Sequence, residues 1–223
     1  TPKPSSAASD VYKRQAEWNV PHLAVEDLKT HAGEIAAAYY AHPDRSMFTV
    51  AITGTNGKTS CAQWLGNALS RLGQPTAVIG TLGIGIYTNG GAGDFDVTGY
   101  TTPDAVLLQR SLVHVRNLGA SALAIEASSI GLHQGRLSGM HFDMALFTNF
   151  TRDHLDYHGD MAAYEEAKAM LFDWPGLQHA VINLDDAMGL RLVQRLQGKQ
   201  ANTAITGYLS LIHISEPTRQ AEI

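Results

Sequence analysis

The sequence predicts an α/β fold in which helices cover both faces of a doubly wound, mainly parallel β-sheet. Short apolar segments alternate along the middle of the chain with segments of helical periodicity, which is the pattern of successive βα units. The apolar segments are rich in Val, Ile, Leu and Ala and do not alternate with polar residues, as expected of strands covered on both faces. A glycine-rich turn of the P-loop type links the first of them to a helix.

The predicted elements follow one another in a regular order. A helix at 25–40 precedes the sheet, and a glycine-rich segment at 82–99 is typical of a hairpin or a mobile loop. Thr102 is expected to cap the helix that begins at Pro103, because proline suits the first helical position. The strands are predicted at 48–53, 76–80, 122–126, 144–148, 180–183 and 203–206, and the helices that follow them at 58–72, 103–118, 161–172 and 186–196.

The composition describes a globular chain. Of the 223 residues, 44% are hydrophobic and 17% are charged, and the formal net charge of −5 argues against a broad nucleic-acid-binding surface. No apolar run approaches the roughly 20 residues that a membrane-spanning helix needs. The single cysteine, Cys61, cannot form an internal disulfide. We therefore expect a cytoplasmic enzyme domain without nucleic-acid or membrane partners.

The two ends of the chain differ from the middle. Residues 1–15 contain two early prolines and a Ser/Ala cluster without periodicity, and residues 208–223 become polar around Pro217. Both segments resemble peptides translated from sequencing-adapter DNA, so we interpret them as a non-native extension and a non-native tail. Ordinary flexible tails are the alternative.

The turn after strand 48–53 is the strongest functional signal. Its glycines let backbone N–H groups face an anion, and the N-terminus of the next helix adds favourable dipole charge. Lys58 would reach the β- and γ-phosphates of a nucleotide, and the Thr59 hydroxyl would ligate Mg²⁺. The loop is shorter than G-x-x-x-x-G-K-[ST], and a plain glycine-rich turn is the alternative. The predicted ATP-binding residues of the turn are Gly54, Thr55, Asn56, Gly57, Lys58, Thr59 and Ser60.

Acidic and imidazole side chains follow two further strands. Glu126 ends strand 122–126 and is expected in the same crevice as the phosphate loop, where a carboxylate can hold Mg²⁺. A surface glutamate at a strand end is the alternative. His154 and His158 follow strand 144–148 with the spacing of a zinc pair on a helix. Because Gly159 works against a long helix there, we favour one histidine acting at Mg²⁺ over the zinc interpretation.

Lys168 lies in the middle of an apolar helical stripe. Tyr164, Ala167 and Leu171 occupy the same face of helix 161–172. One interpretation is a lysine stem that packs on this face and keeps its ammonium group in water. The other is a partly desolvated lysine with a lowered pKa, whose neutral amine can react with CO₂ to form a carbamate that ligates a hard metal ion.

Several motifs together resemble the Mur ligases, and within them the group of UDP-N-acetylmuramoyl-tripeptide synthetases. The motifs are GTNGKT (54–59), TTPD (101–104), EASS (126–129), TNFTRDHLDYHG (148–159), YEEAKAMLF (164–172) and NLDD (183–186). The resemblance implies three domains in the parent protein. Residues 16–46 would end its N-terminal UDP-binding domain, residues 47–207 would form the central ATP-binding domain, and the C-terminal domain would be absent from this chain.

The resemblance also implies residue roles. Lys58, Lys168 and His154 would be catalytic. Metal ligands would be Thr59, Glu126, His154 and Lys168 as a carbamate. Asn183 and Asp185 would lie near the nucleotide, and the residues that contact the UDP-muramoyl peptide would be Thr101, Thr102, Ser129 and Arg136.

The reaction implied by the resemblance is ATP-dependent amide-bond formation. The D-Glu carboxylate of UDP-N-acetylmuramoyl-L-Ala-D-Glu would attack the γ-phosphate, and a diamino acid would then attack the acyl phosphate. Diaminopimelate is favoured over lysine because segments 98–110 and 126–136 look like those of Gram-negative enzymes. The alternatives are a ligase like folylpolyglutamate synthetase, an unrelated P-loop kinase or GTPase, although no N-K-x-D motif is present, and a nucleotide-binding fragment without turnover.

Overall fold

The computed structural model describes residues 26–198 and 202–209. The interpretation of residues 1–15 lies outside these residues, as does that of the tail from residue 210 onward. Tyr208, where the predicted tail begins, is the last residue of a strand. No helix in the described part of the chain is both long and apolar enough to cross a membrane.

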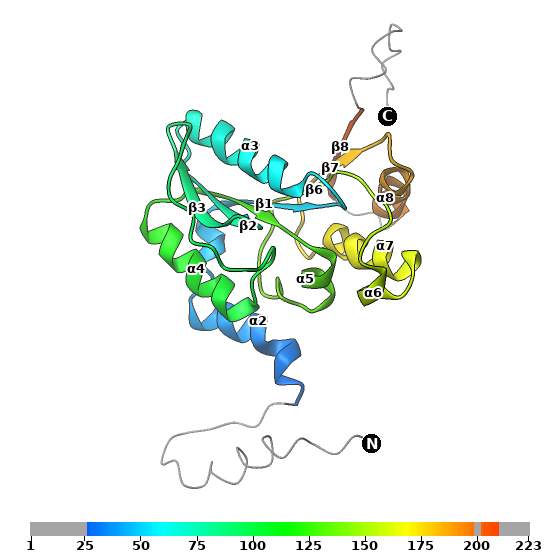
Figure 1. Ribbon diagram of the computed structural model, residues 1–223, viewed down its shortest axis with the longest axis horizontal. Coiled ribbons are helices and arrows are strands. Elements are labelled where there is room, and N and C mark those ends of the chain that lie inside the picture. Colours follow the sequence, from blue (N-terminus) through cyan, green and yellow to red (C-terminus); the bar gives the residue numbers. More distant parts are fainter. Residues whose placement is uncertain (1–25, 199–201, 210–223) are drawn as a thin grey trace, which may run out of the picture.

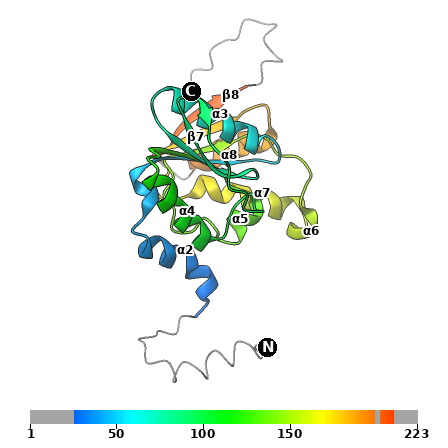
Figure 2. The same cartoon turned by 60° about the vertical axis from the view of Figure 1, so that its left-hand side comes forward.

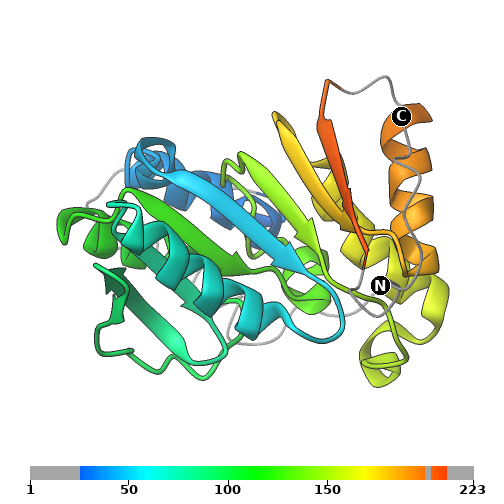
Figure 3. The ribbon, with the colours of Figure 1, turned by 90° about the horizontal axis from the view of Figure 1, so that it is seen from above.

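An eight-stranded sheet in the order β4-β3-β2-β5-β1-β6-β7-β8 forms the centre of the described structure (Figure 3). The strands from β2 to β8 in this order are parallel, and β3 and β4 extend the β2 edge as antiparallel strands. The predicted doubly wound, mainly parallel sheet is therefore confirmed. The strands are β1 Phe48–Thr53, β2 Thr76–Gly80, β3 Gly83–Thr88, β4 Gly91–Ala92, β5 Ala122–Glu126, β6 Met144–Phe147, β7 His179–Asn183 and β8 Ala204–Tyr208.

The chain reverses its direction of winding at β1. It moves from β1 to β2 on one side, returns to β5, and then crosses to β6 on the other side of β1. Ligands of such sheets bind where the winding reverses, beyond the carboxyl ends of the strands. The ends of β5, β1 and β6 are therefore the place where the fold itself predicts a site.

Helices cover both faces of the sheet (Figure 1). Helix α3 (Lys58–Arg71) packs on one face over a small cluster that includes Val50, Ile52 and Val78. The larger apolar cluster lies on the opposite face and includes Leu108 and Leu112 of α4 (Ala105–Asn117), which α2 (Leu28–Tyr39) contacts. The remaining helices are η2 Pro43–Ser46, α5 Ser129–His133, α6 Leu155–His158, α7 Met161–Ala169, η3 Met170–Asp173 and α8 Ala187–Gly198.

The predicted cap of α4 is wrong. The helix begins at Ala105, and the Asp104 carboxylate accepts hydrogen bonds from the N–H groups of Val106 and Leu107. The Thr102 hydroxyl instead bonds the carbonyl of Glu126, at 2.8 Å, and the hydroxyl of Ser128. The hydroxyl of Thr102, which the local sequence assigned to the cap, is therefore used in a tertiary contact.

Other departures are small. The 82–99 segment forms the predicted hairpin through β3 and β4, and the helix predicted at 161–172 tightens into the 3₁₀ turn η3 after Ala169. The short helices α5 and α6 were not predicted, because each has fewer than six residues and shows no periodicity. Both lie beside α7, below the carboxyl ends of the central strands (Figure 2).

Candidate functional site

The phosphate loop is locked in place by the end of β6. Gly54 adopts φ 144° and Gly57 φ 84°, and a Cβ at Gly54 would overlap the Thr148 hydroxyl. That hydroxyl donates to the carbonyl of Asn56 over 2.6 Å, while Asn149 accepts from the Asn56 N–H over 3.0 Å. Residue 54 therefore has to be glycine. The hydrogen bonds connect the loop after β1 to the segment that follows β6.

Lys58 lies over this loop. Its ammonium group donates to the carbonyls of Gly54 and Thr55, each over 2.8 Å. Burial lowers the pKa of Lys58 from its ordinary value, and the charges of Glu126 and Asp153 oppose this effect in part. The loop therefore presents a cation and the N-terminus of α3 at one place, which suits a phosphate group.

Thr59 and Glu126 form a set of oxygen donors beside Lys58. The Thr59 hydroxyl donates to the Glu126 carboxylate over 2.9 Å, and Glu126 is only 1% exposed. Thr81 also holds this carboxylate through its backbone N–H, at 2.9 Å, and its hydroxyl, at 3.2 Å. A hydroxyl and a buried carboxylate are the hard ligands that a small divalent cation such as Mg²⁺ prefers, so these residues fit such an ion.

Lys168 is buried at the back of the loop. It is 1% exposed, and its ammonium group donates to the Gly54 carbonyl over 2.7 Å, the same oxygen that Lys58 bonds. Burial, together with the nearby Lys58 charge, lowers the pKa of Lys168 to about 7. The ring of Tyr164 lies beneath the ammonium group, 4.4 Å from its centroid. The ammonium group of Lys168 is therefore buried and not solvated, whereas its carbamate role stays a prediction.

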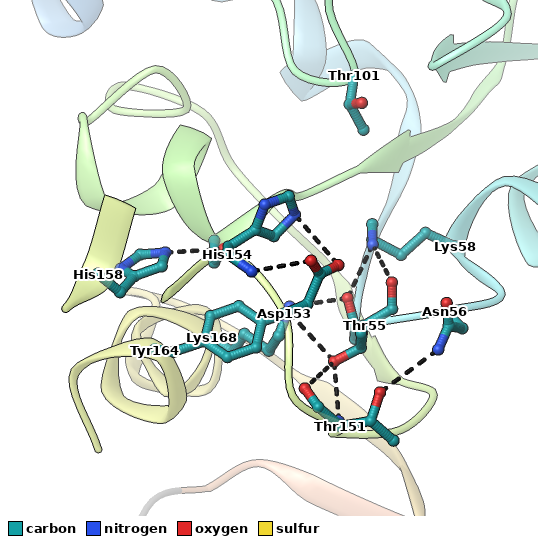
Figure 4. Close-up of polar contacts among 12 residues, drawn as sticks. Thr55, Asn56, Lys58, Thr101, Thr151, Asp153, His154, His158, Tyr164 and Lys168 are labelled. Atoms are coloured by element: carbon teal, nitrogen blue, oxygen red, sulfur yellow. Dashed lines mark hydrogen bonds and ion pairs between the residues drawn. The ribbon is translucent and has the colours of Figure 1, made fainter. Parts of the chain in front are cut away.

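Tyr164 and the two histidines complete this side of the site (Figure 4). The Tyr164 hydroxyl bonds the Thr55 hydroxyl over 3.1 Å, and both histidine rings contact the Tyr164 ring. His154 occupies the N-cap position just before α6 and has the left-handed conformation, at φ 50°. Burial lowers the pKa of His158, and the charges of His133, His154 and Lys168 add to this effect. No group of three or more His, Cys, Asp or Glu side chains suited to a metal occurs among the described residues.

Most of the predicted site residues line one cleft of about 250 Å³. Thr59, Glu126, His154 and Lys168 all line it, although they come from four different segments of the chain. The cleft also contains Ser128 of the EASS motif and Thr81, and of these two only Thr81 was not expected at the site from the sequence. The other residues that line the cleft are Thr55, Asn56, Gly57, Lys58, Thr101 and Ser129.

Several predicted site residues lie outside this cleft. Thr102 is buried in the contacts described above, and Arg136 lines a neighbouring cavity, where it donates to the Thr102 carbonyl over 2.8 Å. Asn183 bonds the Thr148 carbonyl over 2.8 Å, and its own side-chain oxygen accepts from the N–H of Asp185. Asn183 therefore supports the segment that follows β6, and the nucleotide contacts of Asn183 and Asp185 stay predictions. Ser60 is exposed on the first turn of α3.

Comparisons with known proteins identify the family of the chain. A family described as the Mur ligase middle domain matches residues 52–210. A protein of Janthinobacterium sp. (strain Marseille), named UDP-N-acetylmuramoyl-L-alanyl-D-glutamate--2,6-diaminopimelate ligase, is 90% identical over 193 residues, which are 86% of this chain and 38% of that protein. A protein of the same name from Nitrosomonas europaea is 52% identical and matches 86% of this chain and 36% of its own length.

Solved structures give the same result. A structure of a ligase with that name has a TM-score of 0.74 and 38% identity, and the match covers 86% of this chain and 38% of the other. A folylpolyglutamate synthase of Mycobacterium tuberculosis in complex with ADP and AMPPCP has a TM-score of 0.61 at 18% identity, over 81% of this chain and 46% of that one, and shows the fold alone. The chain spans less than two fifths of the length of the curated relatives. It belongs to the Mur ligase middle domain family.

Proposed function

We propose that this chain is the nucleotide-binding part of an ATP-dependent ligase. The whole protein would join 2,6-diaminopimelate to UDP-N-acetylmuramoyl-L-alanyl-D-glutamate, the substrates in the names of its relatives. The observation that supports the proposal is the convergence of Lys58, Glu126 and Lys168 on one cleft beside the phosphate loop. The 90% identity to one of these ligases favours this activity over that of a folylpolyglutamate synthase.

The phosphate loop would bind the triphosphate. Its N–H groups and the N-terminus of α3 would face the phosphate oxygens, and Lys58 would move from the loop carbonyls to the β- and γ-phosphates. Mg²⁺, held by the Thr59 hydroxyl and the Glu126 carboxylate, would neutralise phosphate charge that otherwise repels an acid substrate. The loop and Lys58 would therefore bring two polyanionic substrates into reach of each other.

Ligation would proceed in two steps. A carboxylate oxygen of the terminal D-Glu would form a bond to the γ-phosphorus while the bond from that phosphorus to ADP breaks, which yields an acyl phosphate. The amine of diaminopimelate would then attack the carbonyl carbon, lose a proton and expel inorganic phosphate. His154 and Thr101, which face the same cleft, would help to position the acid substrate.

Lys168 would act as a carbamate. Its lowered pKa favours the neutral amine, which can form an N–C bond to CO₂ with release of a proton. The carbamate would carry a negative charge on two oxygen atoms in place of the buried ammonium group of Lys168. These oxygen atoms would lie near the Mg²⁺ ion that enters with ATP. This role requires a lysine at residue 168, because no other side chain forms this adduct readily at neutral pH.

A binding experiment on residues 1–223 tests the first part of the proposal. Calorimetry should show Mg·ATP binding to this chain, and Lys58→Ala should weaken it about 10- to 100-fold, because a charged hydrogen bond is worth about 1.5–3 kcal/mol. Arg71→Ala, at the far end of α3, is the matched control and should bind as the native chain does. Equal binding by the Lys58 variant would rule out the phosphate role.

Ligation itself must be measured on the whole protein. Residues 1–223 alone should bind nucleotide without turnover, since the relatives are more than twice as long. Formation of ADP that depends on both the muramoyl dipeptide and diaminopimelate would support the proposed activity. Turnover of a folate with glutamate instead would replace it with the alternative ligase.

A further inference from the structure

The side chain of His158 hydrogen-bonds a residue that lines the cleft. His158 is the last residue of α6, and its Nε2 atom lies 3.0 Å from the hydroxyl oxygen of Ser129, the first residue of α5. Ser129 is 1% exposed and lines the cleft together with Lys168 and His154. Within the described residues, His158 is the one side chain that hydrogen-bonds this hydroxyl. The direction of the Ser129 O–H therefore depends on His158.

The His158 ring is held on several sides. It packs against the Tyr164 ring with centroids 5.2 Å apart and planes inclined by 34°. Edge contacts to Tyr157 and His133 lie at 4.8 Å and 5.9 Å. Because Tyr164 in turn supports the Lys168 ammonium group, the ring is tied to the back wall of the site. These ring contacts surround the imidazole in the position in which its Nε2 atom faces Ser129.

Two further hydrogen bonds attach α6 to α5 without His158. The Tyr157 hydroxyl bonds Nδ1 of His133 over 3.0 Å and accepts from the side-chain amide of Gln134 over 3.1 Å. These two bonds link the same pair of helices at a place outside the cleft. His158 differs from them because its bond ends on a hydroxyl that faces the candidate substrate space.

We propose that His158 is a positioning residue that orients the Ser129 hydroxyl toward the carboxylate of the acid substrate. The inference rests on the proposed function, in which that carboxylate enters the cleft. An ionised carboxylate only accepts hydrogen bonds, so the Ser129 hydroxyl must be the donor of the hydrogen bond to it. The Ser129 oxygen must then accept from His158, which requires the neutral imidazole to carry its proton on Nε2. His158 and Ser129 thus form a chain of two donors that ends on the substrate.

Two substitutions of His158 separate this role from simple packing. His158→Phe keeps a ring against Tyr164 and removes the N–H donor, whereas His158→Gln keeps an N–H donor at a similar reach and removes the ring. In the full-length ligase, the proposal predicts that His158→Phe raises KM for the muramoyl dipeptide about tenfold or more and leaves KM for ATP unchanged. His158→Gln should stay within about threefold of the native enzyme.

A matched control and a double substitution complete the test. Tyr157→Phe removes both bonds between α5 and α6 outside the cleft and keeps the ring that packs against His158, so it should leave both KM values unchanged. Ser129→Ala should raise KM for the dipeptide as His158→Phe does, and combining the two should add less than twofold. Nitrogen NMR of residues 1–223 should show the His158 tautomer protonated on Nε2.

The outcomes distinguish this inference from the proposed function. Absence of dipeptide-dependent turnover in the native full-length protein would overturn both, whereas native turnover leaves the variants to decide. A low KM for the dipeptide in His158→Phe, a loss in His158→Gln equal to that in His158→Phe, or additive effects of the His158 and Ser129 substitutions would overturn the positioning role. A variant that fails to bind Mg·ATP would count as misfolded, and the NMR tautomer then decides the case: protonation on Nδ1 overturns the inference, and protonation on Nε2 supports it.

Discussion

Lys168 shows how one residue combines local and tertiary information. Its place on the apolar face of α7 follows from sequence periodicity, which left two interpretations open. The structure decides between them, because the ammonium group lies behind the phosphate loop and next to a second ammonium group. Hydrophobic periodicity predicts on which face of a helix a side chain lies. The partners on that face come from residues more than a hundred positions away.

The lowered pKa of Lys168 predicts a pH dependence of stability. The pKa is about 7 in the folded chain and 10.5 for the ordinary group, so the folded state binds fewer protons between these values. The free energy of unfolding of the native chain, relative to Lys168→Met, should therefore rise from pH 7 to pH 10 with a slope of at most about 1.4 kcal/mol per pH unit. Below pH 7 the difference should be constant.

Urea denaturation at several pH values in CO₂-depleted buffer measures this difference. Lys29→Met, which removes an exposed lysine at the start of α2, is the control and should follow the native curve. A native curve parallel to that of Lys168→Met from pH 7 to 10 would show that Lys168 keeps an ordinary pKa in the folded chain.

Sequence analysis missed the site contacts of Thr81 and Tyr164 for the same reason. Thr81 ends no motif and is exposed, and only the register of β2 beside β5 brings it to the Glu126 carboxylate. Tyr164 was assigned to an apolar stripe, which is correct, but its hydroxyl reaches Thr55 of the phosphate loop. A side chain that acts through a distant partner leaves no local signal in the sequence.

At the scale of elements, the strands were predicted more closely than the helix ends. Strands β1, β2 and β5 have the predicted bounds, because fully buried parallel strands are continuous apolar runs that stop at polar or glycine residues. The start of α4 was displaced, because both Thr102 and Asp104 are good capping residues. The Thr102 hydroxyl donates to the Glu126 carbonyl instead, so Asp104 caps α4.

The cap of α4 can be tested directly. Asp104→Ala removes the acceptor of two backbone N–H groups and should lower the free energy of unfolding by about 1 kcal/mol. The midpoint of urea unfolding measures the change, with an unchanged slope. Asp104→Asn keeps a side-chain oxygen at the cap and should stay close to native. An equal loss in Asp104→Asn and Asp104→Ala would mean that the charge, and not the hydrogen bonds, stabilises this end.

At the scale of the whole molecule, α2 lies close against the middle of the chain. Gly33 of α2 faces the carbonyl of Ser138, and a Cβ there would overlap this oxygen. The helix therefore needs glycine for a close approach of two backbones, although glycine is a poor helix former. Which domain of the whole protein residues 16–46 belong to stays a prediction.

This contact predicts an inverted response to alanine. In an exposed helix, Gly→Ala stabilises by about 1 kcal/mol, whereas Gly33→Ala should destabilise by about 1–3 kcal/mol because the added methyl group is overpacked. Gly198→Ala, at the end of α8 where a Cβ would meet nothing within 4 Å, is the matched control and should be neutral or stabilising. Thermal unfolding of both variants measures the difference. Stabilisation by Gly33→Ala would show that α2 does not pack as closely as described.

The sequence alone determined the class of the fold, most of the strands and the residues of the phosphate loop. These depend on hydrophobic patterning and on glycine, which act over a few neighbouring residues. The tertiary structure decided the cap of α4, the burial of Lys168 and the contacts of Thr81, Tyr164 and His158. Each of these depends on a contact between segments that only the order of the strands brings together, and no local pattern encodes that order.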